Sequence, residues 1–252
     1  MRILLTNDDG VTSEGLLALH TALSPEHEVV IIAPDRNWSI SGHNRTMDRP
    51  IRVNEVSLRD GTPAYSTDGS PADCVALAAL GFLPEKPQLV VSGINNGYNL
   101  ADDITYSGTV AAAFEGIISG IPGIAVSADT LPVWQIEVAA GAVARLVQQV
   151  ALRGLDNDIL LNVNVPSRPY EQIKGLQVTR LGKRLYQDKL IERLDPRGRK
   201  YYWMGGTEVL STHEEGTDAT ACEQGYVSIT PIHLDFTNHK LLDRLRSWDL
   251  RF

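Results

Sequence analysis

Short apolar runs alternate with helical segments through the first 165 residues of the chain. The runs that we interpret as strands cover residues 2–6, 28–33, 51–56, 64–67, 88–92, 124–128 and 159–165. The segments that we interpret as helices cover residues 13–23, 71–80, 108–119 and 133–152. Strands that are apolar on both faces are typical of parallel sheets, whose crossover connections are helices. The pattern therefore predicts an α/β fold with a mostly parallel, doubly wound sheet.

The character of the chain changes after residue 165. Residues 183–203 are charged and aromatic and lead into and out of the turn sequence Asp195-Pro196-Arg197-Gly198. This arrangement predicts a β-hairpin. A strand over residues 224–232 and a terminal helix over residues 238–248 complete the expected elements.

The charge balance excludes whole classes of partner. The chain has 23 Lys and Arg against 31 Asp and Glu, a net charge of −8, and no basic stripe offsets it. Such a surface repels the phosphate backbone of nucleic acid. We therefore expect neither long nucleic acids nor anionic membranes as partners. A small phosphate ester stays compatible with this charge only where a local feature reverses the sign of the field.

The cysteines and the apolar segments indicate the compartment. Cys74 and Cys222 are the only cysteines and lie far apart in the sequence, so neither a disulfide framework nor a zinc site is expected. The first residues become polar too soon for a signal peptide. The most apolar stretch, residues 109–128, contains Glu115 and Pro122 and is interpreted as a helix, a turn and a strand. We expect a cytoplasmic protein.

A carboxylate pair follows the first predicted strand. In open α/β sheets the ligand binds beyond the carboxyl ends of the strands. A dinucleotide-binding or P-loop protein would carry a glycine-rich loop there, but this chain has Asn7-Asp8-Asp9-Gly10. Adjacent carboxylates repel a phosphate unless a cation lies between them, and Mg²⁺ or Mn²⁺ takes such oxygen ligands. The alternative is an ordinary Asp-Asp-Gly turn.

Two further strand ends carry loops rich in neutral oxygen donors and glycine. They are residues 34–44, which include Ser39 and His43, and residues 92–99, which include Asn95. Either loop alone would be interpreted as a solvated turn. Together with the carboxylate pair, three such strand ends favour a metal site. His43 could act as an acid or simply form a hydrogen bond.

The fourth feature is Ser107-Gly108-Thr109, which enters an alanine-rich helix. Free amide groups and a hydroxyl at the positive end of a helix dipole form an anion site. By itself the sequence is best interpreted as a plain N-cap. Beside a metal site on the same crevice, a phosphate cradle is the better interpretation.

Six sequence blocks together resemble the SurE family, the survival-protein 5′/3′-nucleotidases. They are MRILLTNDDG (1–10), APDRN (33–37), GSPADCV (69–75), SGIN (92–95), YSGTV (106–110) and QGYVSITP (224–231). The blocks keep the order of the family and cover essentially the whole chain. The resemblance implies one SurE-like domain over residues 1–252, with a Rossmann-like three-layer core and the active site in residues 1–165. A hairpin and C-terminal arm in residues 166–252 would build a homodimer or homotetramer.

The resemblance also implies a metal-dependent phosphomonoesterase that hydrolyses nucleoside monophosphates, a 5′-nucleotidase with 3′-nucleotidase activity in addition. One divalent ion per subunit, Mg²⁺ or Mn²⁺, would be held by Asp8, Asp9, Ser39 and Asn95. Catalytic roles fall to Asp8, Asn99 and Ser107. Substrate phosphate binding falls to Ser41, Gly42, His43, Asn96, Ser107, Gly108 and Thr109. The alternatives are a nucleotide-sensing module without turnover and, within the enzyme hypothesis, a covalent aspartyl-phosphate in place of direct attack by water.

Two positions depart from the pattern of the family. Ala101 stands where members often have glycine in Asn-x-Gly-x-Asp, so a close approach of the backbone is not expected there. Ile40 follows Ser39 where many members carry a small residue, which would narrow the mouth of the site. Neither change removes a predicted ligand, so activity is still expected.

Overall fold

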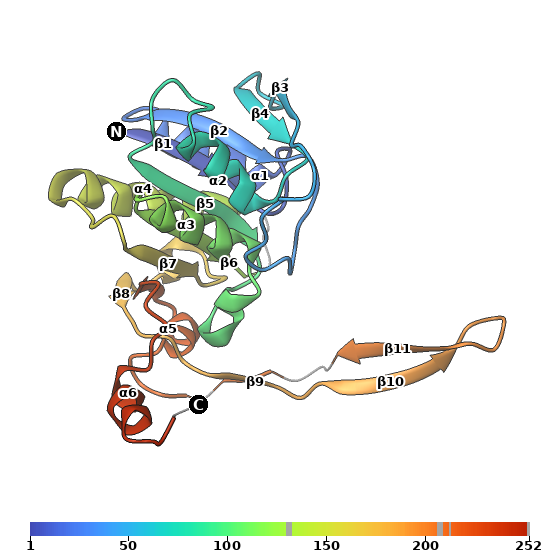
Figure 1. The fold of residues 1–252 in the computed structure, drawn as a ribbon. Coiled ribbons are helices and arrows are strands. Elements are labelled where there is room, and N and C mark those ends of the chain that lie inside the picture. The colour runs from blue at the N-terminus through green and yellow to red at the C-terminus, as the bar shows by residue number, and fades with distance from the viewer. Residues whose placement is uncertain (130–132, 206–208, 212, 251–252) are drawn as a thin grey trace.

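A nine-stranded mixed sheet forms the centre of the computed structural model, which describes residues 1–129, 133–205, 209–211 and 213–250 (Figure 1). Its strands are β1 (Arg2–Thr6), β2 (Glu28–Pro34), β3 (Val53–Ser57), β4 (Pro63–Thr67), β5 (Leu89–Asn96), β6 (Gly123–Ala128), β7 (Leu160–Val165), β8 (Leu176–Val178) and β13 (Val227–Ile232). They lie in the order β3-β4-β2-β1-β5-β6-β7-β13-β8. In this sheet order, the strands from β4 through β2, β1, β5 and β6 to β7 are parallel. Strand β3 pairs antiparallel with β4, and β13 pairs antiparallel with β7. The predicted α/β fold is confirmed.

Helices cover both faces of the sheet. On one face α1 (Glu14–Leu23) packs beside α4 (Val133–Arg153), and on the other α2 (Pro71–Ala79) packs beside α3 (Gly108–Ile118). Side chains alternate along β1, so that Ile3 and Leu5 contact the first helix pair and Leu4 contacts the second. This double burial explains why β1 is a continuous apolar run in the sequence.

The direction of winding reverses at β1. The chain moves from β1 to β2 on one side and later returns to β5 on the other side. A crevice opens beyond the carboxyl ends of the strands where a doubly wound sheet reverses in this way. The residues that follow β1 and end β5 are therefore the ones placed to bind a ligand.

The C-terminal third adds elements outside this core. Strands β9 (Arg184–Tyr186) and β12 (Val209–Ser211) form a short pair, and β10 (Lys189–Leu194) and β11 (Lys200–Gly205) form a hairpin that extends far from the sheet (Figure 1). The predicted turn at residues 195–198 is confirmed by the bond from the amide of Asp195 to the carbonyl of Arg199, 2.8 Å long. The remaining elements are α5 (Asp218–Gln224), α6 (His239–Arg246) and the 3₁₀ turns η1 (Ala101–Thr105) and η2 (Tyr170–Gln172).

Two predicted boundaries were wrong by more than two residues. The strand predicted over residues 88–92 continues to Asn96, because β6 goes on pairing with it after a register shift between Ser92 and Asn95. The strand predicted to begin at residue 224 begins at Val227, because residues 218–224 form α5, which the sequence interpretation missed. Gly225 ends that helix at a φ of 91°, a conformation that favours glycine. Among the described residues, no helix is both long and apolar enough to cross a membrane.

Helix α1 approaches the sheet closely at Gly15. A Cβ atom added there would lie 2.7 Å from the carbonyl oxygen of Ile94, well inside van der Waals contact. We predict that Gly15→Ala destabilises the protein by about 1–3 kcal/mol, because the helix must move away from β5. Chemical denaturation measures this free energy of unfolding.

Gly141 provides the matched control. It lies inside α4, and a Cβ added to it would meet nothing within 4 Å. Gly141→Ala should therefore stabilise the protein by up to about 1 kcal/mol through helix propensity alone. Equal effects of the two substitutions would contradict close packing at Gly15.

Candidate functional site

The turn after β1 is fixed by the side chain of Asn7. Its oxygen accepts from the amide of Gly10 at 3.1 Å, and its nitrogen donates to the carbonyl of Gly10 at 3.0 Å. Gly10 itself has a φ of 103°, which favours glycine. The turn therefore holds Asp8 and Asp9 at the carboxyl end of β1, at the reversal point of the sheet.

The carboxylate of Asp8 meets the N-terminus of α3. The hydroxyl of Thr109 donates to Asp8 Oδ1 at 2.5 Å, and the backbone of Thr109 also hydrogen bonds to this carboxylate. A Cβ atom on Gly108 would lie 2.8 Å from Asp8 Cβ and 3.0 Å from Ser41 Oγ, so only glycine leaves room for both. The predicted phosphate-binding residues Ser41, Gly108 and Thr109 are thus brought together with Asp8.

The negative charges of Asp8 and Asp9 lie close together without a positive charge to balance them among the described residues. Burial raises the pKa of Asp8 above its usual range, although the bond from Thr109 opposes the rise. Burial, and to a smaller extent the negative charge of Asp8, raises the pKa of Asp9 to about 6. In the part of the chain that the structure describes, no Lys, Arg or His forms an ion pair with either carboxylate. Two partly desolvated carboxylates without a cation are a donor set that suits a divalent ion.

Neutral oxygen donors surround the pair. Among the described residues, no group of three or more His, Cys, Asp or Glu side chains is placed to hold a metal ion, so further ligands would have to be neutral. The segment of residues 35–50 supplies Ser39, whose amide donates to Asn37 Oδ1 at 2.7 Å while Asn37 donates to Asp9 at 3.4 Å. In the same segment the amide of Trp38 donates to the carbonyl of Asp8 at 2.7 Å. The backbone around Ser39 is therefore held to the main chain of Asp8 and, through Asn37, to the carboxylate of Asp9.

The end of β5 lies on the other side of the pair. The backbone amide of Asn96 hydrogen bonds to Asp9. The side-chain nitrogen of Asn95 donates to the carbonyl of Gly97 at 2.8 Å, which leaves its amide oxygen as the acceptor available to a cation. Both asparagines belong to β5 rather than to a loop, so a strand holds them in place.

Asn99 and Ser107, two of the predicted catalytic residues, both form structural hydrogen bonds. Asn99 is buried, and its side-chain nitrogen donates to Ser127 Oγ at 2.6 Å. Its carbonyl accepts from Asn162 at 2.8 Å and from Asn164 at 3.0 Å. Ser107 is the N-cap of α3 and accepts from Val110 at 3.1 Å, so its hydroxyl proton is still free to donate to an anion.

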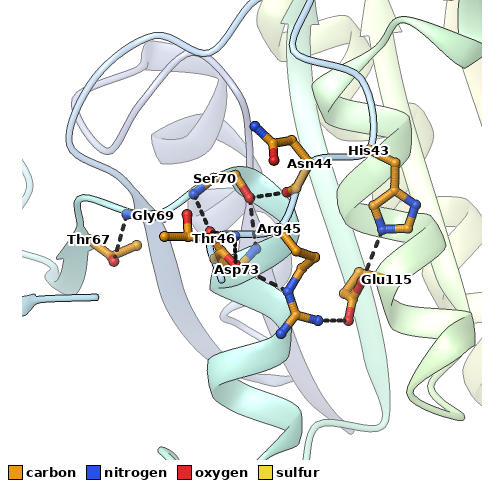
Figure 2. A network of polar contacts seen from close by, with 9 residues as sticks. All are labelled: His43, Asn44, Arg45, Thr46, Thr67, Gly69, Ser70, Asp73 and Glu115. Carbon is orange, nitrogen blue, oxygen red and sulfur yellow. Dashed lines mark hydrogen bonds and ion pairs between the residues drawn. The ribbon is translucent and has the colours of Figure 1, made fainter. Parts of the chain in front are cut away.

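His43 points elsewhere. Its Nε2 lies 3.0 Å from Glu115 Oε2 (Figure 2). Glu115 lies two turns along α3 from Ser107, so the structure does not bring the ring of His43 to the carboxylate pair. The amide of its neighbour Gly42 donates to the carbonyl of Tyr106 at 3.0 Å. The backbone of this segment thus reaches the site, while the side chain of His43 binds to the middle of α3.

Sequence reasoning missed the residues that support the site. Ser127, Asn162 and Asn164 form the buried polar layer under Asn99. Two asparagines spaced by two within the apolar run of β7 lie on one face of that strand, and this was the available signal. Arg45, which contacts Asp73 and Glu115, carried no such signal because its partners lie far away in the sequence.

The two departures from the pattern of the family both occur in left-handed backbone. Ala101 has a φ of 51° and Ile40 a φ of 59°. Ala101 is fully buried, and its amide donates to Asp218 at 2.8 Å. The backbone conformation that glycine would favour is therefore retained at Ala101.

Comparisons with known proteins point to one family. The family model described as "Survival protein SurE" matches residues 3–188. The protein named "5'-nucleotidase SurE" of Chloroflexus aggregans is 53% identical over 252 residues and is covered to 99%, as is this chain. The protein of the same name from Herpetosiphon aurantiacus is 53% identical over 247 residues, with 97% of both chains covered.

A solved structure is also similar. The crystal structure of the SurE protein from Aquifex aeolicus superposes with a TM-score of 0.84 at 43% sequence identity, covering 98% of each chain. The family match, the near full-length relatives and this common fold agree with one another. The chain belongs to the SurE family.

Proposed function

We propose that the protein is a metal-dependent 5′-nucleotidase that hydrolyses nucleoside monophosphates to nucleoside and inorganic phosphate. The observation that carries the proposal is the pair of carboxylates, which has no positive partner among the described residues. Asp8 is buried against the N-terminus of α3, and Asp9 beside it is half-buried. The names of the relatives from Chloroflexus aggregans and Herpetosiphon aurantiacus support the same activity. We extend the proposal to 3′-monophosphates, which present the same dianionic phosphate.

The donor set fits one Mg²⁺ or Mn²⁺ ion, held by Asp8, Asp9, Ser39 and Asn95. When bound, the ion supplies positive charge to the phosphoryl oxygens and lowers the pKa of a water molecule. This local charge reverses the sign of the field that the net charge of −8 creates around the protein. A small phosphate ester can then enter a site from which long polyanions are repelled.

Residues of the chain itself bind the phosphate and accept the proton of the attacking water. The Ser107 hydroxyl and the free amides at the start of α3 hold the phosphoryl oxygens, where the helix dipole favours negative charge. One of Asp8 and Asp9 takes a proton from the attacking water as the bond from phosphorus to the ribose oxygen breaks, and the departing ribose oxygen takes up a proton from solvent to give the nucleoside. Asn99 is held by its buried partners and orients the groups at the edge of the phosphate site.

We predict that Asp8→Asn lowers phosphate release from AMP at least about 100-fold, because the charge that holds the cation is lost. The fold should survive, since the substitution removes an unpaired buried charge. Phosphate release with Mn²⁺ measures activity, and thermal unfolding measures stability. Asp48→Asn, which neutralises an exposed carboxylate on the same segment as Ser39, is the control and should leave both unchanged.

A nucleotide panel with and without EDTA separates the enzyme from a sensor. The enzyme releases phosphate only while the divalent ion is present. Binding of AMP without phosphate release would support the sensing module, and release that persists in EDTA would contradict metal dependence.

Ser107→Ala should lower kcat about 10²–10³-fold, because the substitution removes a hydrogen-bond donor to the charge that develops on the phosphoryl group. Loss of the cap should also cost about 1 kcal/mol of stability. Thr217→Ala removes the equivalent cap of α5, away from the carboxylates, and controls for that cost. A fall in kcat no larger with Ser107→Ala than with Thr217→Ala would reduce Ser107 to a helix cap.

We further propose that the chain forms a homodimer or homotetramer through the hairpin of β10 and β11, in the cytosol. Large apolar side chains on both faces of this hairpin are exposed: Leu190, Ile191, Leu194, Tyr201, Tyr202, Trp203 and Met204. An isolated two-stranded hairpin is marginal in water, so a second copy that covers it would stabilise it. The buried, unpaired Cys74 and Cys222 are consistent with a reducing compartment.

Leu190 and Met204 are direct cross-strand partners, 67% and 84% exposed, so they test this association. The double variant Leu190→Lys with Met204→Lys should elute as a monomer in size-exclusion chromatography with light scattering, because the contact loses its apolar area. Leu152→Lys changes a similarly exposed leucine on α4 and should keep the oligomer. A double variant with unchanged mass would contradict the hairpin as the interface.

A further inference from the structure

Arg45 links two helices through buried carboxylates. Its Nε donates to Asp73 Oδ1 of α2 at 3.1 Å, and its Nη1 donates to Glu115 Oε1 of α3 (Figure 2). The side chains of Asp73 and Glu115 are 0% and 5% exposed, whereas Arg45 is 34% exposed. A residue of the segment 35–50 therefore places its guanidinium between the two helices that cover one face of the sheet.

The two carboxylates depend on Arg45 to different degrees. Asp73 also accepts from the amides of Ser70 at 2.8 Å and Thr46 at 3.1 Å, so it remains satisfied without Arg45. Among the described residues, the side chains that hydrogen bond to the Glu115 carboxylate are Arg45 and the ring of His43. Burying a carboxylate without a cation is strongly unfavourable. Withdrawal of Arg45 is therefore opposed mainly by the Glu115 carboxylate, which would stay buried without its cation.

Arg45 continues a line of attachments that begins at the carboxylate pair. The amide of Trp38 is held by Asp8, the amide of Gly42 is held by Tyr106, and the carbonyl of Asn44 accepts from Ser70 Oγ at 2.5 Å. Residues 35–50 contain no helix or strand, so attachments of this kind, rather than regular secondary structure, define their path. Ser39 and Ser41 lie between the first attachment and the last.

We propose that Arg45 is a positioning residue, whose salt bridges to Asp73 and Glu115 hold residues 38–44 so that Ser39 and Ser41 face the carboxylate pair. This inference rests on the metal site of the proposed function. Helix α3 carries both the partner of Arg45 and, at its N-terminus, the partner of Asp8. Residues 38–44 and the carboxylate pair are therefore both anchored to the same rigid helix, α3.

The test separates positioning from folding. The double variant Arg45→Met with Glu115→Gln removes the attachment without leaving an unpaired charge at position 115, while Asp73 keeps its bonds from the amides of Ser70 and Thr46. The new side-chain amide on α3 can still bond to His43. Mn²⁺ alone is titrated calorimetrically into the metal-free full-length protein, and hydrogen exchange is followed for the peptide that spans residues 37–44. We expect Mn²⁺ to bind about tenfold more weakly, and we expect faster exchange in that peptide with a melting temperature close to that of the wild type.

Arg49→Met is the matched control. Arg49 lies on the same segment but pairs with Asp68 at 2.9 Å, a carboxylate that is 22% exposed and belongs to neither helix. It should leave the Mn²⁺ affinity and the exchange unchanged. Arg45→Lys keeps the positive charge but lacks the planar guanidinium that bonds to both carboxylates at once. The Mn²⁺ affinity of this variant should therefore lie between those of the wild type and the double variant.

Two outcomes would overturn the proposal: wild-type Mn²⁺ affinity in the double variant, or unchanged exchange in residues 37–44. Should the double variant fail to fold, Arg45→Lys decides by the same two measurements. Absence of Mn²⁺ binding to the wild type would remove the metal site itself, and the exchange comparison alone would then decide whether Arg45 orders the segment.

Discussion

The contact between Asp8 and the N-terminus of α3 is the interaction on which the site depends. A carboxylate that is almost wholly buried at a strand end would be costly, and the Thr109 hydroxyl at 2.5 Å and the positive end of the helix dipole offset that cost. The contact requires Gly108, because any side chain there would displace Asp8 or Ser41. Strand β1 and helix α3, about 100 residues apart in the sequence, are thereby locked together.

Helix α3 then sets the position of more than Asp8. Its N-terminus faces the carboxylate pair, its middle holds Glu115 for Arg45, and its inner face packs on β5 and β6, which carry Asn95 and Ser127. Groups that are held by one rigid element keep their mutual distances better than groups on independent loops. This explains how an irregular segment such as residues 35–50 can contribute side chains to a site built mainly on strand ends.

The sequence predicted the features that depend on local pattern. Alternation of apolar runs predicted the parallel core, and Asp8-Asp9-Gly10 predicted the turn at its reversal point, because both are determined within a few residues. The Glu115–Arg45 pair was beyond reach, since it joins residues 70 positions apart and a polar loop looks the same with or without it. The end of β5 was misplaced for a related reason: Gly93 interrupts the apolar pattern, while pairing with β6 resumes at Asn95.

Ala101 illustrates how tertiary contacts override a local preference. A left-handed conformation disfavours a residue with a Cβ atom by about 1–2 kcal/mol, which explains why glycine suits this position. The buried carboxylate of Asp218 accepts from the amide of Ala101 and also from Gly182, so it fixes the backbone from two sides. Departure from that conformation would leave a buried amide and a buried carboxylate with fewer partners, a cost comparable to the strain. The path from Asn99 to η1 is therefore determined by Asp218 rather than by the residue type at position 101, and the change from glycine leaves the edge of the site in place.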